Sequence, residues 1–162
     1  ALPAALWVDR PRAVAPLDGA DVVVIRADGE VQIMAGVRWA APLPLLLQDL
    51  IARQIEMAGA APSVAQSAQS YRIPLRLVSD LRAFEAHVDG ATMNVQAELT
   101  VHLVCTQSAS IVASSPPIKT GMTKVANTSP AASAALRASA SILAREVTLW
   151  LSTVDSSTCP FE

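Results

Sequence analysis

The fold of this chain is organised around residues 38–58, whose sequence is RWAAPLPLLLQDLIARQIEMA. Proline fits the first turn of a helix, where its missing amide would be unpaired, so Pro42 or Pro44 marks a helix start. Apolar residues recur behind it at spacings of three and four, which predicts one apolar helix face. Gly59 then favours the left-handed conformation in which helices commonly end. We place on the apolar face Leu43, Leu46, Leu47, Leu50, Ile51 and Met57, and on the polar side Gln48, Asp49, Arg53 and Glu56.

Four large side chains are expected to be structural anchors: Trp39, Leu47, Leu50 and Trp150. Trp39 precedes the helix directly, so its ring would pack under the first helical turn. Stacking of that ring on a ligand is the alternative interpretation. Leu47 and Leu50 belong to the apolar face of the helix, and Trp150 belongs to the apolar stripe of a second predicted helix.

The composition is that of a folded domain. A length of 162 residues is sufficient for one domain with a substantial core. Apolar residues make up 52% of the chain, which excludes an intrinsically disordered protein. The net charge of −2 gives no electrostatic footprint for a nucleic-acid partner. No stretch approaches the roughly 18 consecutive apolar residues of a membrane-spanning helix.

Two Asp-Gly pairs predict tight turns between strands. The first pair, at residues 28–29, separates β-branched runs near 21–26 and 31–37, which predicts a hairpin because both turn residues tolerate positive φ. The second pair, at residues 89–90, follows a long predicted strand over residues 71–88. We expect that strand to be interrupted near Ser79 and Asp80, and to start or lie at a sheet edge at Pro74.

The clearest strand signal follows the second turn. Residues 93–105 alternate between apolar and polar side chains, which predicts a strand with one buried and one solvated face. Residues 110–113 predict a further short strand. Residues 115–127 are rich in Pro, Ser, Thr and Lys and are expected to be an irregular strand or a loop. Residues 60–70, small and polar, are expected to be a connecting loop.

A second helix is predicted to begin at Ser129, as N-cap, with Pro130 in the first position, and to end near Ser152. Its apolar residues recur at spacings of three and four from Leu136 to Trp150. The ends of the chain, residues 1–18 and 153–162, are expected to be loosely ordered. Within the first end, Ala5–Val8 is predicted to form a short edge strand.

These elements together predict an α+β fold. Strands that are joined by tight hairpins must be antiparallel. Two amphipathic helices then have one natural place, the apolar face of that sheet. We therefore expect a single domain over residues 1–162, an antiparallel sheet with both helices packed on one face as a two-layer sandwich.

The sequence shows no recognisable catalytic, cofactor-binding or metal-binding motif. It lacks glycine-rich phosphate loops and a nucleophile elbow. His87 and His102 have no acidic or cysteine partner in an obvious arrangement, which makes a poor metal site, so both are expected to be solvated surface residues.

Cys105 has the buried parity of its strand. Pairing with Cys159 would fasten the tail to the end of the sheet, and from the residues alone a disulfide and two free thiols are equally open.

The layout resembles the family of ABC-type transport auxiliary lipoprotein components, of the PqiC/YmbA-like type. The resemblance rests on Arg38–Leu43 with the leucine-rich helix behind it, on the segment YRIPLRL at residues 71–77, on Phe84, on the alternating strand, and on the closing helix at 130–151. It covers most of residues 20–152, and it lies in the order and spacing of these features more than in any single motif.

The resemblance implies a periplasmic lipoprotein that serves an MCE-type lipid transport system of the Gram-negative envelope. Its partners would be an MCE-domain protein and the permease and ATPase of the same system. An N-terminal lipid would hold it to a membrane, with the outer membrane favoured over the inner membrane. The cysteine that would carry this lipid is absent from this chain. Export of the chain would favour the Cys105–Cys159 disulfide.

Three hypotheses about function follow. The first is a non-enzymatic accessory subunit that acts through protein contact, at a sheet edge or in a groove walled by the helix at Leu43–Ile51. The second is a carrier of an acyl chain or a lipid, which requires an apolar pocket of some hundreds of Å³. The third is an enzyme, for which the sequence offers no convergent polar residues.

Overall fold

Two long strands form the centre of the molecule. In the computed structural model, which describes residues 1–67 and 72–160, β5 (Leu75–Asp89) and β6 (Thr92–Cys105) pair in antiparallel register from Leu75↔Cys105 to Asp89↔Thr92. Gly90 has a φ of +60° in the turn between them, as the Asp-Gly pair predicted. The alternating burial of β6 confirms the period of two in its sequence.

The predicted hairpin at residues 28–29 is also confirmed. β2 (Asp21–Ile25) and β3 (Val31–Arg38) are antiparallel, and Gly29 between them has a φ of +88°. On the other side of the sheet, β7 (Ser110–Ser114) and β8 (Ile118–Ala126) both pair with β6 in antiparallel orientation.

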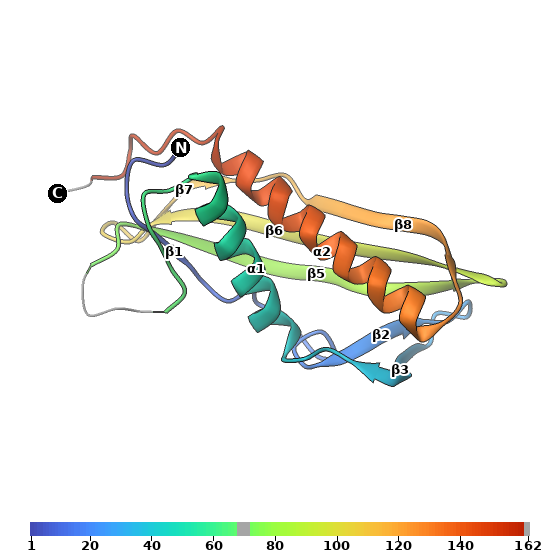
Figure 1. Cartoon of the computed structure of the whole chain (residues 1–162). Helices are drawn as coiled ribbons and strands as arrows, with labels where there is room; N and C mark the ends of the chain where they lie inside the picture. The colour runs from blue at the N-terminus through green and yellow to red at the C-terminus, as the bar shows by residue number, and fades with distance from the viewer. Residues whose placement is uncertain (68–71, 161–162) are drawn as a thin grey trace.

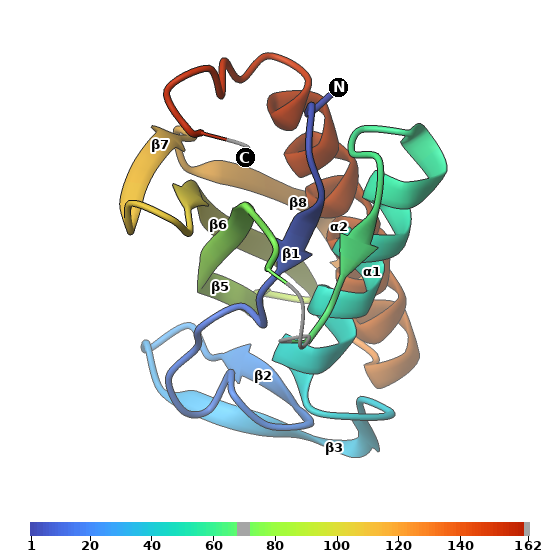
Figure 2. The same ribbon diagram turned by 90° about the vertical axis from the view of Figure 1, so that its left-hand side faces the viewer.

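The expectation of a purely antiparallel sheet is wrong, because the eight strands of the described residues form a mixed sheet. β2 pairs with β5 in parallel, and so does β1 (Leu6–Val8), which also pairs in parallel with β4 (Val64–Ala65). Tight hairpins fix only the strands that they join, whereas the chain between β2 and β5 includes a helix, and such a crossover permits parallel pairing. Figure 2 shows β1 between β5 and β4, so β1 is not the edge strand that we expected.

The first helix, α1 (Leu43–Ala58), begins after Pro42 and ends at Gly59, whose φ of +64° is left-handed. Two assignments of its faces were wrong. Gln48 is buried instead of solvated, because its amide finds carbonyl partners, and Met57 is 82% exposed instead of buried. Met57 lies in the last turn of α1. Near this end of the helix, the residues that reach the core are Ala52 and Ile55.

The second helix, α2 (Ser129–Leu151), has Thr128 as its N-cap, one residue before the predicted Ser129. The Thr128 hydroxyl accepts a hydrogen bond from the Ala131 N–H at 3.3 Å. Ser129 instead donates its hydroxyl to the carbonyl oxygen of Ala35, at 3.0 Å, and so fastens the start of α2 to β3.

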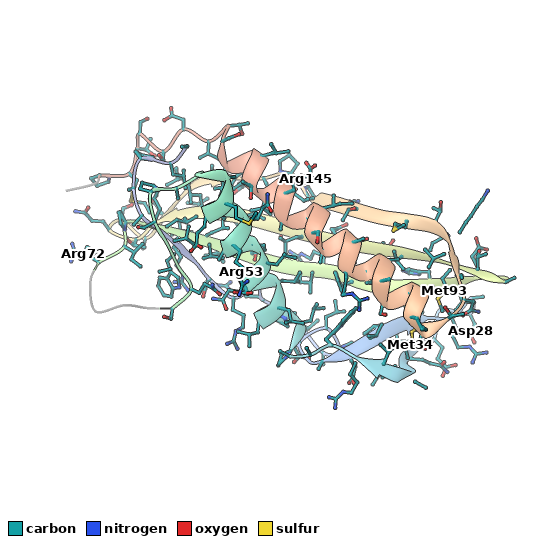
Figure 3. All side chains as sticks on the ribbon, in the orientation of Figure 1. Asp28, Met34, Arg53, Arg72, Met93 and Arg145 are labelled. Atoms are coloured by element: carbon teal, nitrogen blue, oxygen red, sulfur yellow. A yellow bond between two sulfur atoms is a disulfide. The ribbon has the colours of Figure 1, made fainter. Side chains whose placement is uncertain are left out.

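Both helices lie on the same side of the β5–β6 pair and run side by side (Figures 1 and 2). α1 lies over β1 and β4, and α2 crosses β6 and β8. At one end, Met34 of β3 and Met93 of β6 lie beside the first turn of α2 (Figure 3). Near the start of α1 the Trp39 ring meets Phe84 edge to face, with ring centroids 5.7 Å apart. Trp39 therefore packs in the core and not against an open ligand site.

Several boundaries differ from expectation. The interruption expected near Ser79 and Asp80 is a bulge between Leu81 and Ala83. Of residues 115–127, expected to be an irregular strand or a loop, residues 118–126 form the strand β8, whose pairing with β6 has one register shift. The loop expected at 60–70 contains β4. The predictions for Tyr71 and for residues 68–70, 161 and 162 lie outside the described residues.

Candidate functional site

The first candidate surface is the face of β5 and β6 that points away from the helices. Glu85 faces Gln96 directly across the two strands, and the Gln96 amide donates to Glu85 Oε1 at 3.2 Å. Glu85 is only 8% exposed, and His87 Nε2 lies 3.3 Å from the same oxygen. This cluster of Glu85, His87 and Gln96 is a polar network in the wall of the sheet.

The histidines therefore differ from what the sequence suggested. His87 does have a carboxylate neighbour, because residues two apart on a strand share a face. His102 is hydrogen-bonded through Nδ1 to the Ser114 hydroxyl at 2.7 Å. The two histidines pair with Asn94 and Val78 in the β5–β6 ladder, so they are not neighbours. In residues 1–67 and 72–160 no group of three or more His, Cys, Asp or Glu side chains is arranged to hold a metal ion.

The opposite end of this face is closed by Trp7, which the sequence analysis did not single out. The Arg76 guanidinium lies over the Trp7 ring, 4.4 Å from its centroid, and forms an ion pair with Asp9 at 2.5 Å. Because Trp7↔Arg76 is a register pair of β1 and β5, this cation–π contact reinforces the parallel pairing. We assign it a structural role.

The second candidate surface is a groove between β8 and α2, which we call the β8–α2 groove. It has a volume of about 520 Å³ and is open to solvent. Its apolar wall includes Leu149, which is 55% exposed, and the half-buried Trp150. It is lined by Ser115, Pro116, Pro117, Ile118, Lys119, Thr120, Ile142, Glu146, Leu149, Trp150 and Thr153.

The β8–α2 groove is not the groove that the sequence suggested. The expected wall was Leu43–Ile51, but those residues do not line it. Leu47 is 2% exposed and serves the core, while Leu50 is half-buried beside it. Trp150, expected to be an anchor of the core, lies partly in the groove. The signal for this site is the pair Pro116-Pro117 before a strand, together with a leucine at 149 outside the apolar stripe of α2.

The C-terminal tail is fastened beside the start of β5. Cys105, the last residue of β6, and Cys159 form a disulfide. The Cys159 N–H donates to the carbonyl oxygen of Ser156 at 3.0 Å. The pKa of the exposed Asp155 carboxyl lies below its usual value of 3.8. The main cause is the hydrogen bond from the main-chain N–H of Ser157, and a hydrogen bond from the Ser157 side chain adds to it. These contacts fasten the part of the tail from Asp155 to Cys159.

A mixed sheet with two helices on one side, an edge at β8 and an apolar groove beside that edge defines the class: a small domain of α-helices and β-strands with an open surface groove. The family model of the ABC-type transport auxiliary lipoprotein component matches residues 1–147, and the chain belongs to this family. The family assignment is that of a membrane-anchored envelope component associated with ABC-type transport.

Solved structures have the same fold. A Xanthomonas campestris protein of family DUF330 is similar at 25% sequence identity, with a TM-score of 0.79 over 91% of this chain and 84% of that one. An uncharacterised protein shares 17% identity, with a TM-score of 0.66 over 92% and 90% of the two chains. A hypothetical protein from Chlamydia trachomatis shares 6%, with a TM-score of 0.51 over 93% and 98%. No curated protein sequence is significantly similar to this chain.

Neither helix of the described residues has the length and apolarity that crossing a membrane requires.

Proposed function

We propose that this chain, acting as one domain over residues 1–162, is a non-enzymatic accessory subunit of an ABC/MCE-type lipid transport system in the Gram-negative envelope. In this proposal it is periplasmic, held to a membrane by an N-terminal lipid, with the outer membrane favoured. It acts by contact with the MCE-domain protein and, through it, with the permease and ATPase. Membership of the auxiliary lipoprotein family supports the association with ABC-type transport.

The observation that carries the contact function is the exposed apolar groove. Surface leucines are common singly, but here Leu149 lies beside the half-buried Trp150 and the Pro116-Pro117 pair. Apolar patches with a polar rim mark interaction sites on soluble domains. The rim is supplied by Lys119, Glu146 and Thr153.

Binding to the cognate MCE-domain protein tests this function. The purified domain, immobilised in folded form, is expected to retain its cognate MCE-domain protein with a dissociation constant of about 100 µM or lower, as a transient contact requires. Absence of binding at the upper end of that range, with the fold verified by circular dichroism, would contradict the proposal.

The alternative function is a carrier for an acyl chain. The β8–α2 groove favours it in size, since small-molecule pockets span about 300–1,000 Å³. The groove is open, however, and a carrier must shield its cargo from water, so we prefer the contact function. Native mass spectrometry decides between them: a carrier retains lipid through gentle purification, whereas a contact subunit shows only the mass of the chain.

A further inference from the structure

We propose that the β8–α2 groove receives an extended segment of a different protein, which adds to the free edge of β8 as a further strand and carries acidic side chains between apolar ones. This inference rests on the proposed contact function and deepens it, because it names the surface and the chemistry of the partner. It uses the edge strand, the groove beside it and the charges along it.

The edge of β8 is the first observation. β8 pairs with β6 on one side, and among the described residues no strand pairs with its other side. An unpaired edge presents main-chain N–H and C=O groups, which are the groups that an added strand recognises. Lys124 has a φ of +55° and donates its N–H to the Asn94 side chain, so the regular part of the edge is Ile118–Met122.

The groove beside this edge is the second observation. It begins at residues 115–120 and is closed on the far side by α2, from Ile142 to Trp150. Figure 1 shows β8 running along the margin of the molecule next to α2. Side chains of a strand alternate between faces, so every second residue of an added strand would enter the groove and meet Leu149 and Trp150. Those residues of the partner are therefore apolar.

The charges select a different protein over a second copy of this chain. β8 contains Lys119 and Lys124 and no acidic residue. The Lys119 side chain is 70% exposed, and its Nζ lies 3.5 Å from Glu98 Oε1 of the neighbouring strand β6. Pairing β8 with itself would align only positive charges, which destabilises a strand pair. On the α2 side, the charged residue that lines the groove is Glu146, and Arg145 lies outside the lining. Acidic residues on the face of the partner strand that points away from α2 would lie beside Lys119 and share its charge with Glu98.

The other long edge of the sheet, β3, is the natural comparison. Val31 and Ile33 are 55% and 57% exposed there, so apolar exposure alone does not distinguish the two edges. The β3 edge has a φ of +77° at Gly36, which interrupts a regular ladder. The pocket beside β3 contains the ion pair of Arg38 with Asp21, 3.6 Å apart, next to its apolar lining residues.

Hydrogen exchange with the cognate MCE-domain protein tests the inference. We expect added protection of amides in residues 118–122 and no change in β3.

Leu149→Lys is expected to weaken binding at least about tenfold, and Lys119→Glu to weaken it with a reduced salt dependence. The matched controls are Met57→Lys and Arg53→Glu, which change two exposed residues of α1; the Arg53 side chain is 71% exposed. Both variants should bind with a dissociation constant within about twofold of that of the parent.

The outcomes separate the two proposals. Binding with protection at β3 or around Glu85, or unchanged binding of both Leu149→Lys and Lys119→Glu, overturns the docking inference and leaves the contact function standing. Absence of binding by the folded parent overturns both. If the amides of residues 118–122 are protected from exchange in the isolated chain and lose this protection on dilution, the β8 edge pairs with a second copy of this chain, and the inference is overturned. Should Leu149→Lys fail to fold, Lys119→Glu carries the test alone.

Discussion

The side-chain amide of Gln48 donates a hydrogen bond of 3.0 Å to the carbonyl oxygen of Val8 and thereby ties α1 to β1. The same nitrogen donates at 2.6 Å to the carbonyl of Gln66, just after β4. Gln48 is 4% exposed, so these bonds satisfy carbonyls that helix α1 shields from water. Replacing Gln48 with Leu should lower the free energy of unfolding by about 1–3 kcal/mol, measured by urea denaturation, because buried acceptors lose their donor.

Gln54 provides the control for this change. It lies on the same helix, and its side chain makes no hydrogen bond within the described part of the chain. Gln54→Leu should alter the unfolding free energy by no more than about 0.5 kcal/mol. Equal effects of the two substitutions would show that Gln48 contributes helix packing and not a specific bond.

The Cys105–Cys159 disulfide should stabilise the domain. It links residues 54 apart in sequence and restricts the unfolded chain. Cys159→Ser is expected to lower the free energy of unfolding by about 2–4 kcal/mol under oxidising conditions. The parent protein should lose a similar amount in the presence of a reductant, and the variant should not respond to the reductant at all.

Chemical labelling checks that the bond exists in the purified protein. Iodoacetamide added to the denatured but unreduced parent should leave its mass unchanged, whereas labelling after reduction should modify both cysteines. Labelling of Cys105 and Cys159 without reduction would mean two free thiols, and the stability prediction would then lose its basis.

Local features of the sequence predicted the parts of the fold that depend on neighbouring residues. Both Asp-Gly turns, the two helices and the alternating strand follow from rules that act over a few residues. The parallel pairs did not follow, because β1 meets β5 across more than sixty residues and no local pattern specifies that register. Sheet order is a property of the closed core, in which α1 must cover β1 and β4.

The candidate site was less accessible to sequence analysis for the same reason. The β8–α2 groove joins residues 115–120 to residues 142–153. Leu149 lies outside the apolar stripe of α2, but no local pattern shows that it comes to lie beside residues 115–120. Gln48 shows the converse case. Its polarity placed it on the solvated side of α1, yet two main-chain carbonyls give its amide a buried position.

The two leucines expected to anchor α1 should differ in their contributions. Leu47 is 2% exposed, while Leu50 is half-buried at the border of the core. Leu47→Ala should lower the free energy of unfolding by about 2–5 kcal/mol, because a cavity remains in a closed core. Leu50→Ala should have the smaller effect, since solvent and neighbouring side chains can fill the space. Thermal and urea unfolding of both variants measures the order, and a reversed order would contradict the anchor role of Leu47.

Gly121 should be the most sensitive glycine of the sheet. It pairs with Gln96, and a Cβ atom at this position would lie 2.3 Å from the carbonyl oxygen of Val95, which is main chain and cannot move aside. Gly121→Ala should therefore force β8 away from β6 and lower the free energy of unfolding by about 1–3 kcal/mol. Gly19→Ala is the control, because nothing lies within 4 Å of its Cβ position, and it should be neutral within about 0.5 kcal/mol. Gly121→Ala can be compared with Gly19→Ala in binding to the MCE-domain protein as well. Weaker binding of Gly121→Ala alone would show that the contact function depends on the close approach of Gly121 to Val95, which sets the position of β8. A stable Gly121→Ala with unchanged amide protection in residues 118–126 would mean that β8 and β6 are farther apart than this contact requires.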